Sequence, residues 1–140
     1  MNSDISFRSG CPLSSALDLV GDKWSLLIIR DMIFLQKKYF KDFLNSSESI
    51  ATNILSARLN KLECLGLVDK SKDPDNKRQW IYEPTQKALD LLPAIVELII
   101  WSIKLDLPVG IPLDMKQSLM SNKNSFIEQT ISKFYESNSS

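Results

Sequence analysis

The chain of 140 residues contains no histidine and only two cysteines, and these absences exclude several kinds of site. Histidine is the commonest general base and metal ligand in proteins, so its absence argues against metal-dependent and His-dependent chemistry. Cys11 and Cys64 are separated by 52 residues, a distance that matches neither a disulfide framework nor a zinc-ligand spacing. We therefore expect no metal site, no cofactor and no enzyme activity.

Long apolar runs are also absent. No segment approaches the roughly 18 apolar residues that a membrane-spanning helix needs, and the most apolar stretch, 89–101, contains Pro93 and Glu97. The N-terminus has no apolar run after its first charges, which is not the pattern of a signal peptide. These features predict no membrane association and a cytoplasmic location.

The composition is that of one ordinary globular domain with a hydrophobic core, since 44% of the residues are hydrophobic and 24% are charged. The chain carries 17 basic and 17 acidic residues, so a strong overall attraction to nucleic acid is also missing. The charge is unevenly distributed, because residues 37–87 contain 10 Lys and Arg against 7 Asp and Glu. This local excess permits a DNA-binding surface in that segment without requiring one.

The most informative segment that is present, residues 50–68, has the pattern of an amphipathic helix followed by a strand. Leu55, Leu59 and Leu62 fall on one side at about 100° per residue. Short polar side chains fall on the other, and such a surface fits the major groove of DNA. The members of this polar face are Asn53, Ser56, Ala57, Asn60 and Lys61.

The flanking segments predict further helices and a β-hairpin. Capping and stop signals indicate a short helix opened by Pro12 and ended by Gly21, and a second helix capped by Asp22. Gly66 should end the helix of 50–68, whose start either Ser49 or Thr52 could cap. The expected ranges are helices 12–20, 23–35, 39–44, 86–105 and 124–135, the helix that starts after Ser49 or Thr52 and stops at Gly66, and strands 67–72 and 79–82, joined by the turn 73–76.

After the hairpin, Thr85 is placed to cap a long helix that Pro93 should bend or break, and Pro108 and Pro112 indicate a linker. The order of elements predicts a winged helix-turn-helix fold, mainly α with a small β-hairpin, with additional dimerisation helices. Apolar side chains on the helix after the hairpin favour a twofold dimer, which would place two recognition helices roughly 34 Å apart.

Several motifs resemble the HxlR-type transcriptional regulators, a winged-helix family related to the MarR regulators. The motifs occupy residues 11–24 (CPLSSALDLVGDKW), 40–43, 50–55, 58–59, 62–63 and 66–68. The resemblance implies a homodimeric DNA-binding repressor or activator on a short, partly palindromic operator. It also implies that the cysteine matching Cys11 can sense electrophiles or oxidants. The sequence departs from the family at Lys77-Arg78, where a Pro-Pro pair is common.

On this basis the expected organisation is an N-terminal arm (1–10), a winged-helix DNA-binding domain with its dimerisation helix (11–107), and a C-terminal extension with a terminal helix at the dimer interface (108–140). The interface residues that we expect are Ile99, Ile100, Trp101, Phe126, Ile131 and Phe134. The expected core residues are Trp24, Leu27, Ile28, Phe40, Phe43, Leu55, Leu59 and Leu62.

The candidate DNA contacts on the polar helix follow from side-chain chemistry. Asn53 and Asn60 can pair with adenine edges, and Ala57 can lie against a thymine methyl group. Thr52 and Ser56 can bond bases or phosphates.

Basic residues supply the remaining candidate contacts. Lys41 and Lys61 are expected at phosphates, and the hairpin residues Lys77 and Arg78 are expected at or in the minor groove. Arg58 lies beside the leucine face, where a structural ion pair is the alternative interpretation.

Cys11 has two interpretations. It could be a small hydrophobic side chain at a helix end, or a thiol whose reactive thiolate is favoured by the helix N-terminus, with Arg8 or Lys23 assisting. Cys64 is interpreted as incidental.

Together these features predict a sequence-specific DNA-binding regulator that responds to a small-molecule or oxidant effector. The alternative is a winged-helix module for protein–protein contacts without DNA binding, which the zero net charge keeps open.

Overall fold

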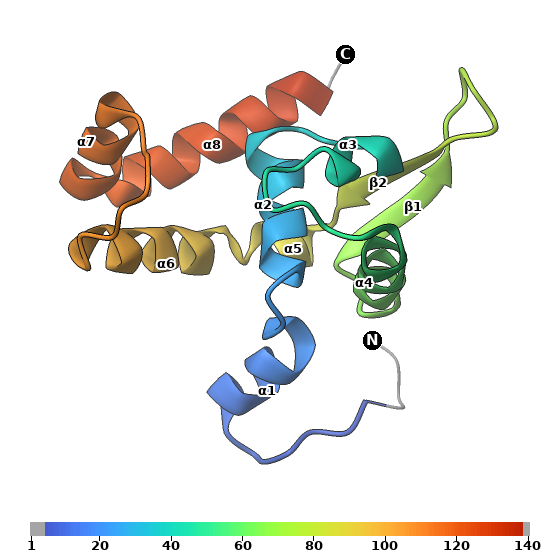
Figure 1. The fold of residues 1–140 in the computed structure, drawn as a ribbon, viewed down its shortest axis with the longest axis horizontal. Coiled ribbons are helices and arrows are strands. Elements are labelled where there is room, and N and C mark those ends of the chain that lie inside the picture. Colours follow the sequence, from blue (N-terminus) through green and yellow to red (C-terminus); the bar gives the residue numbers. More distant parts are fainter. Residues whose placement is uncertain (1–4, 139–140) are drawn as a thin grey trace. The chain divides into compact units, whose positions relative to one another are not determined.

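The computed structural model describes residues 5–138, which form helices and one two-stranded antiparallel sheet (Figure 1). The elements are α1 Pro12–Val20, α2 Ser25–Phe34, α3 Phe40–Leu44, α4 Thr52–Cys64, β1 Val68–Lys72, β2 Trp80–Pro84, α5 Gln86–Leu89, α6 Leu92–Lys104, α7 Leu113–Ser121 and α8 Lys123–Asn138. Contacts divide the chain into two compact units, the first ending at Ala88 and the second beginning at Leu89.

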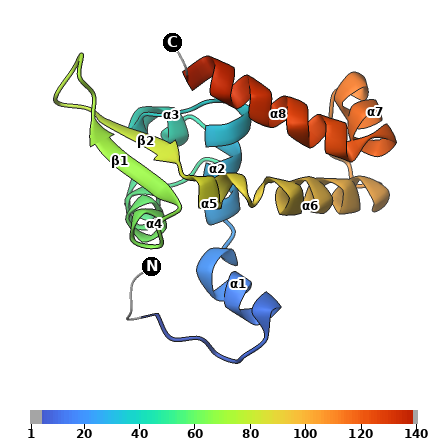
Figure 2. The same cartoon turned by 180° about the vertical axis from the view of Figure 1, so that it is seen from behind.

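The first unit has the winged helix-turn-helix arrangement. Helix α4 packs against α3 and β1, and β2 packs against α2 and α3, as the views from both sides show (Figures 1 and 2). Strands β1 and β2 pair from Val68 opposite Pro84 to Lys72 opposite Trp80. A bridge between Tyr39 and Ile81 adds a short third strand segment, so the sheet is anchored directly at the start of α3.

The core of the first unit is built from the apolar faces predicted by helical spacing. Leu55, Leu59 and Leu62 are buried on α4, and Ile28 and Phe43 are buried on α2 and α3. Three expected core residues, Trp24, Leu27 and Phe40, are only partly buried because they lie at the margin of this core.

Helix α4 ends in a Schellman motif, as the glycine predicted. Gly66 has φ +76°, a conformation that strains any residue with a Cβ, and its N–H bonds the carbonyl of Glu63 at 3.0 Å. The N–H of Leu67 bonds the carbonyl of Leu62 at 2.9 Å. The chain therefore turns from the recognition helix into β1 within two residues.

Two expected helix caps are wrong. The N-cap of α4 is Ala51, which has no side-chain oxygen, and Ser49 instead takes a positive φ of 59° in the preceding turn. The Thr85 hydroxyl donates to the carbonyl of Gly66 at 2.7 Å, so it joins the hairpin base to the end of α4.

The second unit consists of α6, α7 and α8, which pack on one another. The helix expected from 86 to 105 is interrupted as predicted, because Pro93 occupies the first turn of α6 and α5 ends at Leu89. Helix α7, Leu113–Ser121, was not among the expected helices, because only the terminal helix was predicted after the linker marked by Pro108 and Pro112.

The expected division placed the boundary between residues 107 and 108, whereas the two compact units meet between Ala88 and Leu89. The difference arises because α6 packs with α7 and α8. The functional division remains a prediction. Part of the expected N-terminal arm, residues 1–4, lies outside the described residues. Across residues 5–138, no helix is both long and apolar enough to cross a bilayer.

Candidate nucleic-acid interface

Helix α4 presents its polar face to solvent. Thr52, Asn53, Ser56, Ala57 and Asn60 are all exposed, whereas the three leucines of the opposite face are buried. A helix that buries one side and exposes a row of short side chains can approach base edges closely, since no long side chain holds it away from the groove floor. This geometry is what base readout by α4 requires.

An ion cluster joins α4 to the N-terminus of α2. Asp22 accepts the N–H groups of Trp24 and Ser25, each at 2.9 Å, at the start of α2, although the N-cap itself is Trp24 rather than the predicted Asp22. Its Oδ1 lies 3.1 Å from Arg58 Nε, although this buried N–H makes no hydrogen bond of good geometry within the described residues. The Nζ of Lys61 lies 4.0 Å from Oδ2.

Burial raises the pKa of Asp22, but hydrogen bonds from Ser25 and Trp24 and the charge of Arg58 outweigh burial and leave the pKa lowered. The carboxylate is therefore charged at neutral pH and attracts both basic residues of α4. The alternative interpretation of Arg58, a structural ion pair, agrees with this position. Lys61 has the same partner at a longer distance, so its ammonium is near Asp22 as well as the polar face of α4.

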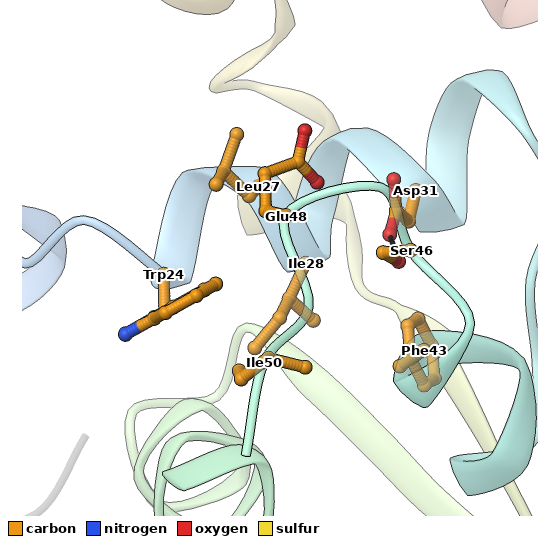
Figure 3. Close-up of a pocket in the computed structure, with 8 residues that line it drawn as sticks. All are labelled: Trp24, Leu27, Ile28, Asp31, Phe43, Ser46, Glu48 and Ile50. Carbon is orange, nitrogen blue, oxygen red and sulfur yellow. Dashed lines mark hydrogen bonds between the residues drawn. The ribbon is translucent and has the colours of Figure 1, made fainter.

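The turn between α3 and α4 is held by a buried carboxylate. The side chain of Asp31 is 4% exposed; it accepts Arg30 Nε at 2.9 Å and Nη2 at 2.7 Å, and its Oδ2 lies 3.4 Å from Lys37 Nζ. Ser46, in the turn itself, donates its hydroxyl to the same carboxylate (Figure 3). The path of the chain into α4 therefore depends on a residue of α2.

A second ion pair holds the same turn from outside. Arg30 binds both oxygens of Glu48, with Nη1 3.0 Å and Nη2 2.8 Å away. The hydrogen bonds from Arg30 lower the pKa of Glu48 despite its partial burial, and the same bonds raise the pKa of Arg30. A cavity of about 10 Å³ lies beside this turn and has room for one water molecule (Figure 3). Glu48 lines it together with the apolar side chains of Trp24, Ile28 and Ile50.

The hairpin is fastened to the start of α3 by a buried hydrogen bond. The hydroxyl of Tyr39 donates to Asp73 Oδ2 at 2.9 Å, and this bond to an anion raises the pKa of the phenol. Asp73 is 6% exposed and also accepts the N–H of Asp75 at 2.9 Å, which shapes the turn. Beyond this base, Lys77 and Arg78 are exposed at the tip. The wing is thus anchored at its root while its basic tip is accessible.

Cys11 is exposed at the N-cap of α1, where its N–H bonds Ser9 Oγ at 3.2 Å. The two cations expected to assist it have other partners: Arg8 pairs with Asp18, and Lys23 Nζ lies 5.0 Å from the ring centre of Trp24. Accessibility and the helix N-terminus therefore remain as the features that favour reactivity. Cys64 is also exposed and unbridged.

The expected dimer residues divide into three groups by their exposure. Trp101 is 62% exposed, and Leu98 and Leu105 share its face of α6 with 52% and 48% exposure. Ile100 and Phe134 are each only 7% exposed, so within this chain they belong to the core rather than to a surface. The remaining three, Ile99, Phe126 and Ile131, are partly buried.

Sequence reasoning missed the residues that position the interface: Asp31, Glu48, Tyr39 and Asp73. Each is a polar residue whose partner is distant in sequence, so no local periodicity marks it. Across residues 5–138, no group of three or more Cys, Asp or Glu could hold a metal ion.

The exposed recognition helix, the anchored turn before it and the hairpin with Lys77 and Arg78 at its tip define a winged helix-turn-helix regulator of transcription. Comparison with known proteins agrees. Residues 19–106 match the model of the HxlR-like helix-turn-helix family. An uncharacterised HTH-type transcriptional regulator of Mycobacterium tuberculosis is 36% identical over 119 residues, covering 81% of this chain and 72% of the relative.

Solved structures show the same relationship. The candidate transcription factor PA1607 is 31% identical with a TM-score of 0.67, over 76% of this chain and 73% of that one. The oxidised redox regulator HypR is 26% identical with a TM-score of 0.59, over 67% and 96%. Quinone-bound YodB of B. subtilis is 27% identical with a TM-score of 0.55, over 67% and 99%. The chain belongs to the HxlR family of transcriptional regulators, which is not a family of enzymes.

Proposed function

We propose that this regulator binds a pseudo-palindromic DNA operator as a homodimer, with one α4 helix in each of two successive major grooves. The observation that carries the proposal is the exposed row of short polar side chains on α4 beside an anchored wing that exposes Lys77 and Arg78. In this arrangement Asn53 and Asn60 read base edges, and Lys41 and Lys61 contact phosphates. Lys77 and Arg78 enter or flank the minor groove, where a narrow A·T tract attracts arginine.

The homodimer is supported by apolar surface on helices that the chain leaves uncovered. Leu98, Trp101 and Leu105 form a continuous exposed face of α6. Helix α1 buries only Val20 and exposes Leu13 at 67%. Apolar faces of this kind on a regulator with a twofold operator are covered most simply by a second copy. We place residues 108–140 beside this interface as its support.

The decisive experiment is selection of duplexes from a random DNA pool, followed by binding of the selected operator across a salt titration. We expect an inverted repeat whose half-sites lie about 10 base pairs apart, with affinity that falls as salt rises. Asn53→Ala should relax base preference at one position in each half-site, by about 1–3 kcal/mol. Lys87→Gln, an exposed change on α5, is the matched control and should bind as the wild type does.

Failure to select any duplex would contradict the proposal and favour the protein–protein module. Binding of a selected duplex that does not weaken as salt rises would contradict it as well. A DNA-binding regulator acts where the DNA is held, and on that ground we propose a cytoplasmic location.

A redox response through Cys11 is a second element of the proposal. It rests on the exposed thiol at a helix N-terminus and on relatives described as a redox regulator and as a quinone-bound regulator. Diamide or a quinone should release operator DNA from the wild type but not from Cys11→Ser, while Cys64→Ser should respond as the wild type does. Equal release from the wild type and Cys11→Ser would remove Cys11 from the mechanism.

A further inference from the structure

A groove lies between the start of α3 and strand β2. These two segments lie side by side in the first unit (Figures 1 and 2). The volume of the groove is about 310 Å³. Its lining residues are Tyr39, Phe40, Lys41, Arg78, Gln79, Trp80 and Tyr82. It therefore joins one basic residue of the helix-turn-helix to one of the wing through a set of aromatic side chains.

Trp80 makes this groove unusual. It is a large apolar residue that is 41% exposed on β2. Two ammonium groups flank it: Lys70 Nζ lies 4.5 Å and Lys72 Nζ 5.2 Å from the indole ring centre. Lys72 is the cross-strand partner of Trp80, so the hairpin itself places the positive charges at this ring.

The charges at the groove are complementary to an anion. The charged side chains that line it are Lys41 and Arg78, both basic. The neighbouring acids have internal partners, since Asp73 accepts the Tyr39 hydroxyl and Asp42 accepts the Tyr39 N–H. Asp75 is exposed on the turn but does not line the groove.

A groove with cations at its two sides and aromatic rings between them matches the chemistry of a sugar–phosphate backbone. Phosphates meet the ammonium and guanidinium groups, and the apolar faces of deoxyribose meet the rings. The proposed function places α4 in the major groove and the wing at the minor groove of the duplex. The DNA backbone between these two grooves must therefore pass over the protein surface that joins the wing to the helix-turn-helix.

We propose that this groove holds the sugar–phosphate backbone of the operator, with Trp80 packed against deoxyribose and with Lys41 and Arg78 on the same short run of phosphates. The inference deepens the proposed function and rests on it. The contact carries no base information, so it sets the register between wing and recognition helix and strengthens binding to all duplexes alike.

The test measures the affinity of Trp80→Val and Trp80→Phe for the selected operator and for an unrelated duplex. Trp80→Val removes the ring but keeps a residue favourable in strands, and we expect a loss of about tenfold on both duplexes. Trp80→Phe keeps an aromatic surface and should retain most of the affinity. Indole fluorescence that DNA quenches in the wild type, and less in Trp80→Phe, would report the contact directly.

A double-mutant cycle of Lys41→Gln and Arg78→Gln keeps the proposal testable if Trp80→Val does not fold. Each change should lower the slope of log affinity against log salt by about 1. Shared phosphates predict that the two losses are coupled rather than additive. Lys87→Gln again serves as the control.

Wild-type affinity in Trp80→Val, or additive losses in the cycle with no change in slope, would overturn the inference while the proposed function stands. A wild-type protein that binds no duplex would overturn both.

Discussion

Replacement of Asp31 by alanine should destabilise the first unit more than any other change to a single polar group described above. Asp31 is the acceptor for Arg30, Lys37 and Ser46, and its side chain is 4% exposed. Removing one partner of a buried charge network costs about 3–5 kcal/mol, because the remaining groups lose their partner away from water. Arg30 and Lys37 are 26% and 18% exposed, so water compensates in part and we expect about 2–3 kcal/mol.

The assay is urea unfolding of the full chain, followed by tryptophan fluorescence, with a thermal scan beside it. The expected loss corresponds to a fall of about 10 °C in Tm for a unit of this size. Operator affinity, measured well below the new Tm, should fall as well, because Ser46 no longer holds the turn that leads into α4. The structural change thus has a functional consequence at a site that contacts no DNA.

A double-mutant cycle with Ser46→Ala isolates the contact. Ser46→Ala alone should cost about 1 kcal/mol, and less when Asp31 is already absent, because only the hydrogen bond from Lys37 Nζ, 2.9 Å long, is then lost. Asp69→Ala, an exposed carboxylate on β1, is the matched control and should stay within about 0.5 kcal/mol of the wild type. An Asp31→Ala protein as stable as this control would refute the reasoning.

Three further predictions follow from the ion pairs and the exposed face. Because the pKa of Glu48 is lowered, its bond to Arg30 stabilises the fold above about pH 4.5, and this stabilisation is lost as pH falls below that value. Glu48→Gln should therefore make the free energy of unfolding fall less steeply at acid pH. Arg58→Met should raise the pKa of Asp22, measured by NMR titration, and lower stability by about 0.5–1 kcal/mol; an unchanged pKa would contradict the ion pair. Trp101→Glu should shift the mass measured by light scattering from two subunits towards one; an unchanged mass would place the interface elsewhere.

The recognition helix could be predicted from sequence because its signals are local. The spacing of Leu55, Leu59 and Leu62 determines which side of α4 is buried, and Gly66 is the residue type that accepts the positive φ of its stop with the least strain. Pro93 likewise interrupts the following helix through its own ring and missing N–H. These effects act within one or two helical turns, so the surrounding fold does not alter them.

The cap of α4 and helix α7 could not be predicted in the same way. Ser49 and Thr52 are good capping residues, but the turn is held by Ser46 and Glu48 bound to α2, and the helix starts after Ala51. Helix α7 has few apolar residues at helical spacing, and its contacts with α6 and α8 decide its formation. Ile100 shows the same limit, since helical spacing marks it as apolar but not whether its own chain or a partner covers it.

The order of helices and hairpin, the polar face of α4 and membership of a family of regulators were all contained in the amino-acid sequence, because each depends on periodicity, turn chemistry or short motifs. Only the tertiary structure brought Asp31 to Ser46, Tyr39 to Asp73, and Trp80 to the groove beside α3. The two hydrogen-bonded pairs, Asp31 with Ser46 and Tyr39 with Asp73, lie 15 and 34 residues apart along the chain. A hydrogen bond over such a distance exists only once packing has closed the intervening loops.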